Sequence, residues 1–187
     1  MSISPSTGSF PAVGSLGRLS AFMCVVVAVG GALAELALIW VWLSPSLVET
    51  LVVPRLGLGA YSVSLDGWTR AAGFAVSMLP MVVVGYLLHQ AYALFDGYRL
   101  GNVFTDAAPI RLRRIGMCML ALAVLRPVTT TLLGIVLTMS NPPGQRIVSI
   151  GISIDEYMIA AFGGLILAIG HVMVEAKRLA DDNLQII

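Results

Sequence analysis

The sequence contains few charged residues, and this deficit excludes most soluble folds. Charged side chains make up 11% of the chain and hydrophobic ones 58%, whereas about a quarter of an average soluble domain is charged. One soluble core of 187 residues cannot hide so much apolar surface, but lipid can face it directly. The net charge of +1 gives no general attraction for nucleic acid, so we expect no direct nucleic-acid binding.

Motifs for catalysis and metal binding are missing as well. The sequence has no glycine-rich phosphate loop, no Cys-x-x-Cys pair, no nucleophile elbow and no His-Glu-x-x-His helix. Its two cysteines, Cys24 and Cys118, stand near the starts of apolar runs on the side expected to face the cytoplasm, where a disulfide is disfavoured. We therefore expect no enzymatic activity, no cofactor and no metal.

The chain does contain four apolar runs that are long enough to cross a bilayer, which takes about 20 residues. They predict an all-α membrane protein, a four-helix bundle with spans at about residues 19–43, 71–95, 115–139 and 157–174. Residues 1–17 are rich in Ser, Gly and Pro and predict a disordered N-terminal tail. Residues 18–187 then form one transmembrane domain that ends in a polar tail, 175–187, extending the last helix along the membrane surface.

The first run also resembles a cleavable signal peptide. Its segment Ala32-Leu33-Ala34 has the small residues of a signal-peptidase site. However, the apolar run continues past this point and ends in Trp40 and Trp42, as a span ending at the membrane interface would. We favour a retained span.

Two loop segments show the alternation that is typical of a half-buried strand. In residues 60–65 and 147–154, Val, Ile, Leu and Tyr alternate with Ser and Gly. Both segments fall on the extracytoplasmic side, the first within a loop at 44–70. We therefore expect a small two-stranded β ribbon packed over the helix ends. At the end of the second segment, Ser153 and Glu156 have the spacing of a capping box that starts the fourth helix, and Asp66 can cap the second.

The positions of the basic residues predict the orientation. One side of the membrane receives Arg18, Arg99, Arg111, Arg113, Arg114, Lys177 and Arg178. The other side receives only Arg55, Arg70 and Arg146. Both termini are therefore expected in the cytoplasm, which places a multi-pass protein in a bacterial cytoplasmic (inner) membrane.

Ionisable residues inside spans are costly, and they mark a candidate intramembrane polar network. Glu35 and Arg126 differ in estimated depth by about one helical turn, so they are expected to pair, either to hold the bundle or to bind an anion or move a proton. His89 and His171 both lie in the cytoplasmic half. Together with Glu175 they could form a metal or proton-relay site, or be ordinary hydrogen-bonded histidines. The neighbouring threonines at 129–131 are expected to bond their own helix backbone.

Two segments carry a resemblance to a known family. The run LFDGYRLGNVFTDAAPIRLRRIG at 94–116 and the polar end EAKRLADDNLQII at 175–187 resemble a family of small bacterial integral membrane proteins of unknown function. The resemblance covers about residues 70–187. It implies four spans with both termini inside. Members of similar families are often encoded beside a helix-turn-helix regulator, which implies a cytoplasmic partner; the resemblance implies no catalytic residues.

Two functions remain open from the sequence. The first is a non-enzymatic membrane protein that contacts a cytoplasmic partner, such as a transcriptional regulator, through a surface containing Arg99, Arg111, Arg113, Arg114 and Glu175. The second is a small transporter or channel that uses Glu35, Arg126, His89 and His171. Because four spans enclose little pathway, the second function would require a homo-oligomer. The glycines at 163, 164 and 170 permit close helix contacts in either case.

Overall fold

The computed structural model describes residues 12–59, 61, 63–100, 107–142, 146 and 153–184. It contains four long helices: α1 (Ala12–Leu43), α4 (Gly67–Arg99), α5 (Ala107–Thr138) and α6 (Ile154–Leu184). All four are long and apolar enough to cross a membrane, which confirms the predicted spans. Because α1 begins at Ala12, residues 12–17 are helical instead of belonging to a disordered tail.

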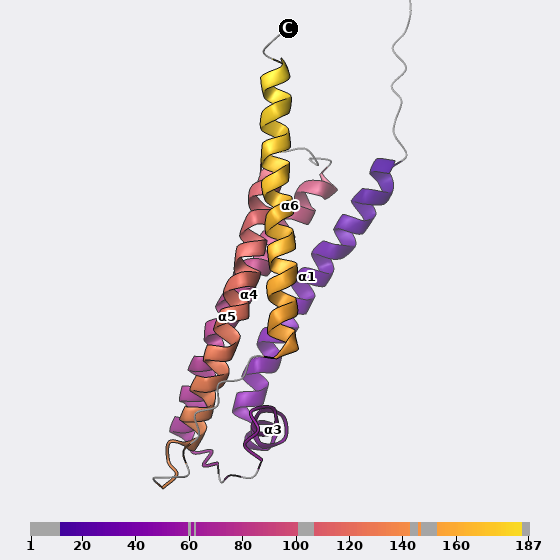
Figure 1. The fold of residues 1–187 in the computed structure, drawn as a ribbon. Helices are drawn as coiled ribbons and strands as arrows, with labels where there is room; N and C mark the ends of the chain where they lie inside the picture. Colours follow the sequence, from indigo (N-terminus) through magenta and orange to yellow (C-terminus); the bar gives the residue numbers. More distant parts are fainter. Residues whose placement is uncertain are drawn as a thin grey trace, which may run out of the picture.

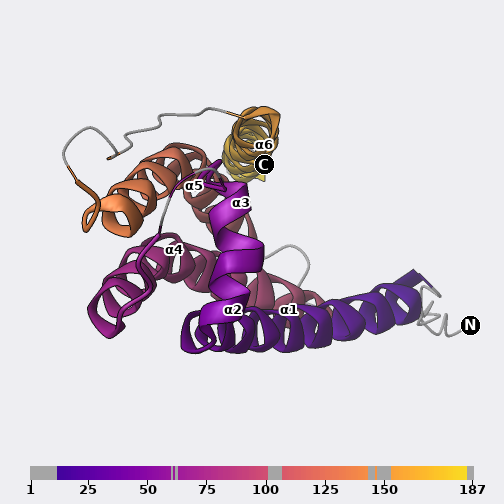
Figure 2. The same ribbon diagram turned by 90° about the horizontal axis from the view of Figure 1, so that it is seen from below.

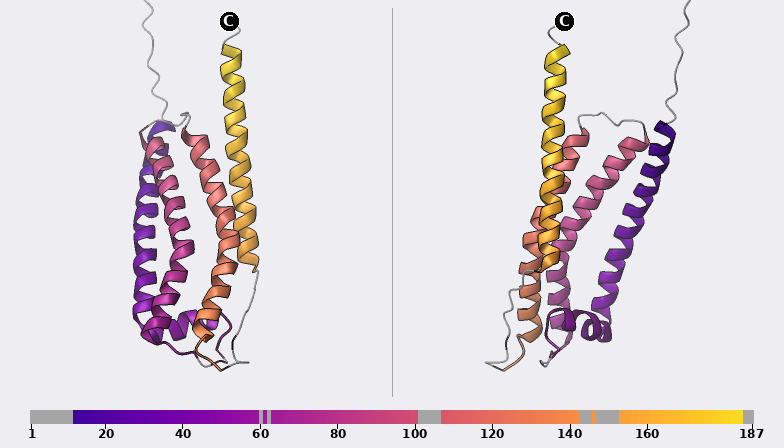
Figure 3. Two further views of the ribbon diagram at one scale, coloured as in Figure 1. Left: turned by 90° about the vertical axis from the view of Figure 1, so that its left-hand side faces the viewer. Right: turned by 45° about the vertical axis from the view of Figure 1, so that its right-hand side comes forward.

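The four helices form an open arc instead of a closed bundle. Each packs mainly on its neighbours in the chain, α1 on α4, α4 on α5, and α5 on α6, so that α1 and α6 lie at the two ends of the arc (Figure 1, Figure 2). Lipid explains why an open arc is stable, since apolar side chains facing acyl chains gain little from being covered by another helix. The start of α1 and the end of α6 lie at the same end of the arc (Figure 3).

A short helical segment lies across the opposite end of the arc. It consists of α2 (Pro45–Leu47), the π-helical turn η1 (Val48–Val52) and α3 (Val53–Arg55), and Figure 2 shows it running from the end of α1 toward α5 and α6. The expectation of a loop throughout 44–70 is therefore wrong for 45–55. Pro45 and Pro54 each stand in the first turn of a helical piece, where a missing N–H is tolerated.

This crossing segment covers the best-packed core among the described residues. Val48, Leu58 and Leu137 are almost fully buried, and Trp42 and Val53 pack with them. These residues come from the end of α1, from the crossing segment, from Leu58 just after it and from the end of α5. The crossing segment therefore holds together helices that do not otherwise meet.

Trp42 belongs to this core and not to the membrane interface, which corrects the prediction. It is 5% exposed, and its ring lies so close to Gly73 of α4 that a Cβ there would come within 2.1 Å of it. Its Nε1 donates a hydrogen bond to Ser77 Oγ at 3.1 Å. Trp40, by contrast, is 66% exposed, as expected of a tryptophan at an interface.

The β ribbon is not confirmed. Residues 61 and 63–66 are described and form no strand, and residues 60, 62 and 147–152 lie outside the described part of the chain. The alternation reports burial correctly for Val63 and Leu65, which pack on the core below the crossing segment while Ser64 is exposed, but not for Tyr61, which is exposed. Asp66 stands at the N-cap of α4, but its carboxylate accepts a hydrogen bond from the Thr69 hydroxyl and none from a backbone N–H.

Glycines allow the backbones of α5 and α6 to approach each other very closely. A Cβ on Gly116 would lie 2.8 Å from the carbonyl oxygen of Gly163, and a Cβ on Gly170 would lie 3.2 Å from that of Pro109. Gly163 and Gly170 thus permit close contact as predicted, whereas Gly164 has nothing within 4 Å.

These contacts also shift α6 along α5. Because α5 and α6 are antiparallel and Gly163 contacts Gly116, a residue nine positions before Gly163 lies beside one nine positions after Gly116. Ile154, the first residue of α6, therefore lies beside Leu125, near the middle of α5. At its other end α6 continues for 14 residues, 171–184, beyond the contact of Gly170 with the first turn of α5, which is about 20 Å of helix. Figures 1 and 3 show α6 beginning partway along α5 and projecting beyond the other helices. The predicted extension is confirmed through Leu184, but it continues straight and does not turn along a surface.

Candidate functional site

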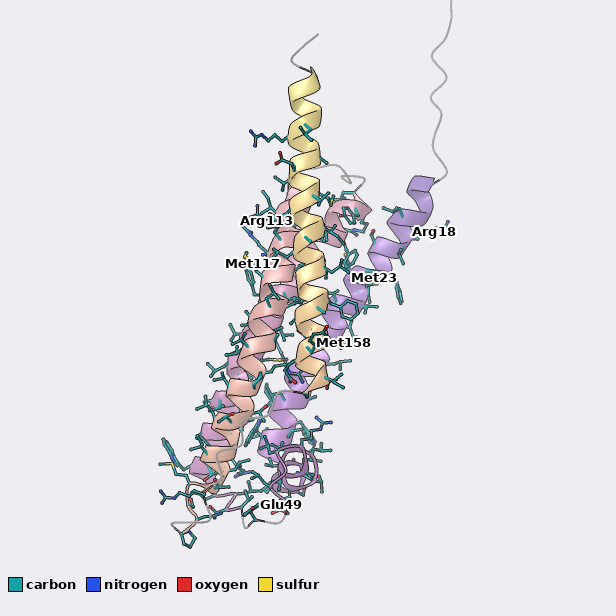
Figure 4. The ribbon with its side chains drawn as sticks, in the orientation of Figure 1. Arg18, Met23, Glu49, Arg113, Met117 and Met158 are labelled. Carbon is teal, nitrogen blue, oxygen red and sulfur yellow. The ribbon has the colours of Figure 1, made fainter. Side chains whose placement is uncertain are left out.

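The projecting part of α6 shares its end of the molecule with most of the basic residues. We call this the extension end: the start of α1, the end of α4, the start of α5 and residues 175–184 of α6. Figure 4 shows Arg18 and Arg113 toward this end and Glu49 at the opposite one. The sequence predicted contact residues here, and the structure shows that they have different surroundings.

Three of the predicted contact residues bind within the protein. Arg99 forms an ion pair with Asp96 on its own helix at 2.7 Å. Arg111 of α5 donates a hydrogen bond to the backbone carbonyl of Ala93 near the end of α4. The stem of Arg113 lies against Gly170, with Cγ 2.8 Å from where a Cβ would stand. Arg111 therefore joins α5 to α4 and Arg113 lies between α5 and α6, whereas the ion pair of Arg99 stays within α4.

The remaining charged residues at this end are exposed. Arg18, Arg114 and Arg178 come from α1, α5 and α6, and Glu175 stands on α6. Since Arg99 already neutralises Asp96, the exposed charge that we can place is mainly positive. The arrangement suits an acidic surface, and guanidinium groups favour carboxylate partners because they can bind both oxygens.

A second candidate lies beside the first turn of α6, and the sequence did not predict it. Arg126 interacts electrostatically with Glu156. The Glu156 carboxylate accepts a hydrogen bond from the Ser153 backbone N–H at 2.8 Å, and Ser153 Oγ accepts one from Asp155 N at 3.2 Å. The capping box is therefore confirmed, and it also supplies the acidic group that faces Arg126. Only the shift of α6 along α5 brings the two residues together.

The four residues of the predicted intramembrane network do not meet in the part of the chain that the structure describes. Glu35 faces Gly85 of α4, its Oε1 lying 3.9 Å from where a Cβ would stand, and forms no ion pair with Arg126 there. His171 accepts or donates a hydrogen bond at 2.9 Å with the carbonyl oxygen of Leu167, one turn back on its own helix. His171 adjoins Gly170 and therefore lies level with the start of α5. His89 lies about one helical turn from Ala93, which is level with Arg111, on the side toward the middle of the span. The two histidines therefore lie at different depths. A shared function of the four stays a prediction.

Two threonines in the third span bond the backbone of their own helix. Thr129 donates to the carbonyl of Leu125 at 2.8 Å, and Thr131 donates to that of Pro127 at 2.9 Å, as predicted for threonines in a span. Cys24 and Cys118 are buried and unbridged. In the described ranges no group of three His, Cys, Asp or Glu side chains is placed to hold a metal ion.

Two apolar cavities flank Trp42 at the end with the crossing segment. One, of about 320 Å³, is lined by α1 and α4 and includes Arg70. The other, of about 400 Å³, lies between α1, α4 and the crossing segment and includes Arg55. Arg70 Nη1 donates to the carbonyl of Leu43 at 3.0 Å, and its Nε is buried without a partner. These linings fit hydrocarbon, such as a lipid acyl chain, and provide no reactive group.

Comparison with known proteins gives one result. Residues 45–187 match the family described as "Protein of unknown function (DUF2975)". The match includes the crossing segment, α4, α5 and α6, and begins just after α1. No curated protein and no solved structure matches the chain.

Proposed function

The chain belongs to this family of proteins of unknown function, and we propose that it is a non-enzymatic membrane protein that acts by binding a soluble protein at its extension end. The observation that carries the proposal is the projecting part of α6. An isolated helix of this length is marginally stable in water, so its persistence beyond α5 favours a function outside the membrane.

The exposed charges indicate the chemistry of the partner. Arg18, Arg114 and Arg178 present guanidinium groups from three helices at this end, and an acidic protein surface would pair with them. Residues that already bind within the protein, such as Arg99 and Arg111, would support this surface without contacting the partner.

The distribution of basic residues supports a cytoplasmic location for this end. Arg18, Arg99, the arginines at 111–114, Lys177 and Arg178 fall on this side, and positively charged residues are retained on the cytoplasmic side of a membrane. A soluble cytoplasmic protein, such as the transcriptional regulator that the family resemblance implies, could then bind here, and the protein would be a multi-pass component of the inner membrane.

Photo-crosslinking in intact membranes tests this proposal. A photoreactive amino acid replaces Arg114 in one variant and Arg178 in another, and the control variant carries it at Trp68, which is also exposed, at the opposite end. We expect a soluble protein with an acidic surface to be captured from the first two positions and not from Trp68. Capture should be lost when the two other exposed arginines at this end are changed to Glu. Capture that is equal from Trp68, or none from either arginine position, would refute the proposal.

A further inference from the structure

A cavity at the end opposite to the extension combines apolar walls with one basic side chain. It is the cavity of about 320 Å³ beside Trp42, between the end of α1 and the start of α4, and we call it the α1–α4 cavity. Ile39 of α1 and Ala71 and Phe74 of α4 are among its apolar lining residues, and its lining also includes Arg70. Ligand cavities usually measure about 300–1,000 Å³, so this one suits part of a single hydrocarbon chain.

The protein does not neutralise the charge of Arg70. This side chain is partly buried, its Nη1 donates to the carbonyl oxygen of Leu43 at 3.0 Å, and its Nε is buried without a hydrogen-bond partner. In the described part of the chain Arg70 forms no ion pair. Asp66, one turn earlier, instead accepts a hydrogen bond from the Thr69 hydroxyl. A partly buried guanidinium without a counter-ion favours an anionic ligand, and phosphate suits it because two N–H groups can bind two of its oxygens.

The start of α4 adds backbone donors beside Arg70. Asp66 stands at the N-cap, but its side chain caps no backbone N–H. Gly67, the first residue of α4, belongs to the lining of the cavity, and no atom of the described residues lies within 4 Å of where its Cβ would stand. The N–H groups of this first turn are therefore open to a ligand, and the positive end of a helix attracts phosphate.

The depth of the cavity matches the level of lipid headgroups. Trp40 of α1 and Trp68 of α4 adjoin its lining residues and are 66% and 79% exposed, and exposed tryptophans mark the membrane interface. Arg70 follows Trp68 by two residues and so lies near this level. Ala71 and Phe74 follow along α4 toward the middle of the span. A lipid bound here can therefore place its phosphate at Arg70 and part of an acyl chain along Ala71 and Phe74.

We propose that the α1–α4 cavity binds one phospholipid of the surrounding bilayer, with its phosphate on Arg70 and part of one acyl chain between α1 and α4. Free phosphate would leave the apolar walls uncovered, and hydrocarbon alone would leave the guanidinium without a counter-ion. The second cavity differs, because its arginine, Arg55, is exposed and can be solvated by water. The lipid site lies at the opposite end from the proposed binding surface for a soluble protein, so either proposal can fail without the other.

Mass spectrometry of the intact full chain released from lipid nanodiscs tests the proposal. The nanodiscs contain phosphatidylethanolamine and phosphatidylglycerol in equal amounts, and loosely held lipid is stripped with an alkyl maltoside. We expect the unsubstituted chain to retain one phospholipid and the retained fraction to fall severalfold in Arg70→Gln. Arg55→Gln, which changes the exposed arginine of the second cavity, should retain as much lipid as the unsubstituted chain. Retention that is equal in the two variants, or no lipid on the unsubstituted chain, would overturn the proposal.

A second pair of variants leaves Arg70 in place, because Arg70 also bonds the end of α1. Ala71→Phe adds a ring to the wall of the cavity, whereas Ala75→Phe adds the same ring one turn further along α4, at an exposed residue outside the lining. We expect lipid retention to fall severalfold in Ala71→Phe and to stay unchanged in Ala75→Phe. If Ala71→Phe retains the lipid as well as Ala75→Phe does, no acyl chain occupies the cavity and the proposal fails.

Competition distinguishes a lipid from free phosphate. Inorganic phosphate in excess should leave the retained lipid in place, because it does not cover the apolar walls. A single-chain alkylphosphocholine should displace the lipid, whereas the alkyl maltoside of the same chain length, which has no phosphate, should not. Displacement by inorganic phosphate alone, or equal displacement by the two detergents, would contradict a site that recognises phosphate and hydrocarbon together.

Discussion

Among single residues, the glycines between α5 and α6 are expected to tolerate a side chain least. In Gly163→Ala the new Cβ would stand 2.8 Å from that of Met119, so the helices must separate. We expect the free energy of unfolding to fall by about 1–3 kcal/mol, the usual cost of overpacking. Gly164→Ala is the matched control: nothing lies within 4 Å of its Cβ position, and better helix propensity should leave stability unchanged or raise it by up to about 1 kcal/mol. Unfolding in mixed micelles measures both, and equal effects would argue against this interface.

The two tryptophans at the end of α1 provide a second residue-level comparison. Trp42→Ala removes a buried ring and its hydrogen bond to Ser77, and should cost about 3–5 kcal/mol of unfolding free energy. Trp40→Ala removes a ring that is mostly exposed and should change it by no more than about 0.5 kcal/mol. The same unfolding assay distinguishes them. A larger loss for Trp40→Ala would mean that the tryptophans are placed the wrong way round.

A third comparison asks which acidic residue interacts with Arg126. Stability is measured for Arg126→Gln, for Glu156→Gln and for the double variant, and the cycle is repeated with Glu35→Gln. Because Arg126 interacts electrostatically with Glu156, we expect a small coupling energy for that pair, reduced by solvent screening, and additivity for Arg126 with Glu35. The opposite result would restore the pairing that depth alone had predicted.

At the scale of elements, the sequence predicted what depends on local pattern. The four spans, the capping box of Ser153 and Glu156 and the inward-facing Val63 and Leu65 all follow from the composition or spacing of neighbouring residues. Such features need no knowledge of how distant segments meet.

What the sequence did not predict depends on contacts between distant segments. The helical turns at 45–55 contain two prolines, which by local pattern predict a loop. They are helical because Val48 and Val53 pack on the ends of the long helices, a contact that local pattern does not predict. The proximity of Arg126 to Glu156 depends on the shift of α6, which the close contact of Gly116 with Gly163 sets. Hydropathy defines the length of a span but not its offset relative to the next one.

The projecting part of α6 makes a prediction for hydrogen exchange. If a soluble protein binds the extension end, backbone amides in 175–184 should exchange slowly in membranes that retain this partner and rapidly in the purified chain, since a short isolated helix opens readily. Amides of α5, such as those near Leu122, serve as the internal reference and should not change. Rapid exchange of 175–184 in both preparations would show that the extension has no stabilising neighbour.

At the scale of the whole molecule, the alternation of four helices brings the start of α1 and the end of α6 to the extension end (Figure 3). We expect a membrane-impermeant thiol reagent to label Trp68→Cys in intact cells. The same reagent should label Arg114→Cys only after the cells are permeabilised, when it can reach the cytoplasmic face. The expected orientation follows from the positions of the basic residues. Trp68 and Arg114 are both exposed and lie at opposite ends of the molecule. Labelling with the reverse pattern would invert the orientation, and labelling of both from one side would contradict the fold.

The close contact of α5 with α6 also has a mechanical consequence. Where Gly116 meets Gly163, backbone lies against backbone, with no flexible side chain between them to absorb a displacement. A sideways force on the tip of α6 is therefore transmitted along a stiff rod to its first turn, beside Arg126. Because Gly163 and Gly170 both hold α6 against α5, such a force is shared by the two helices along this contact.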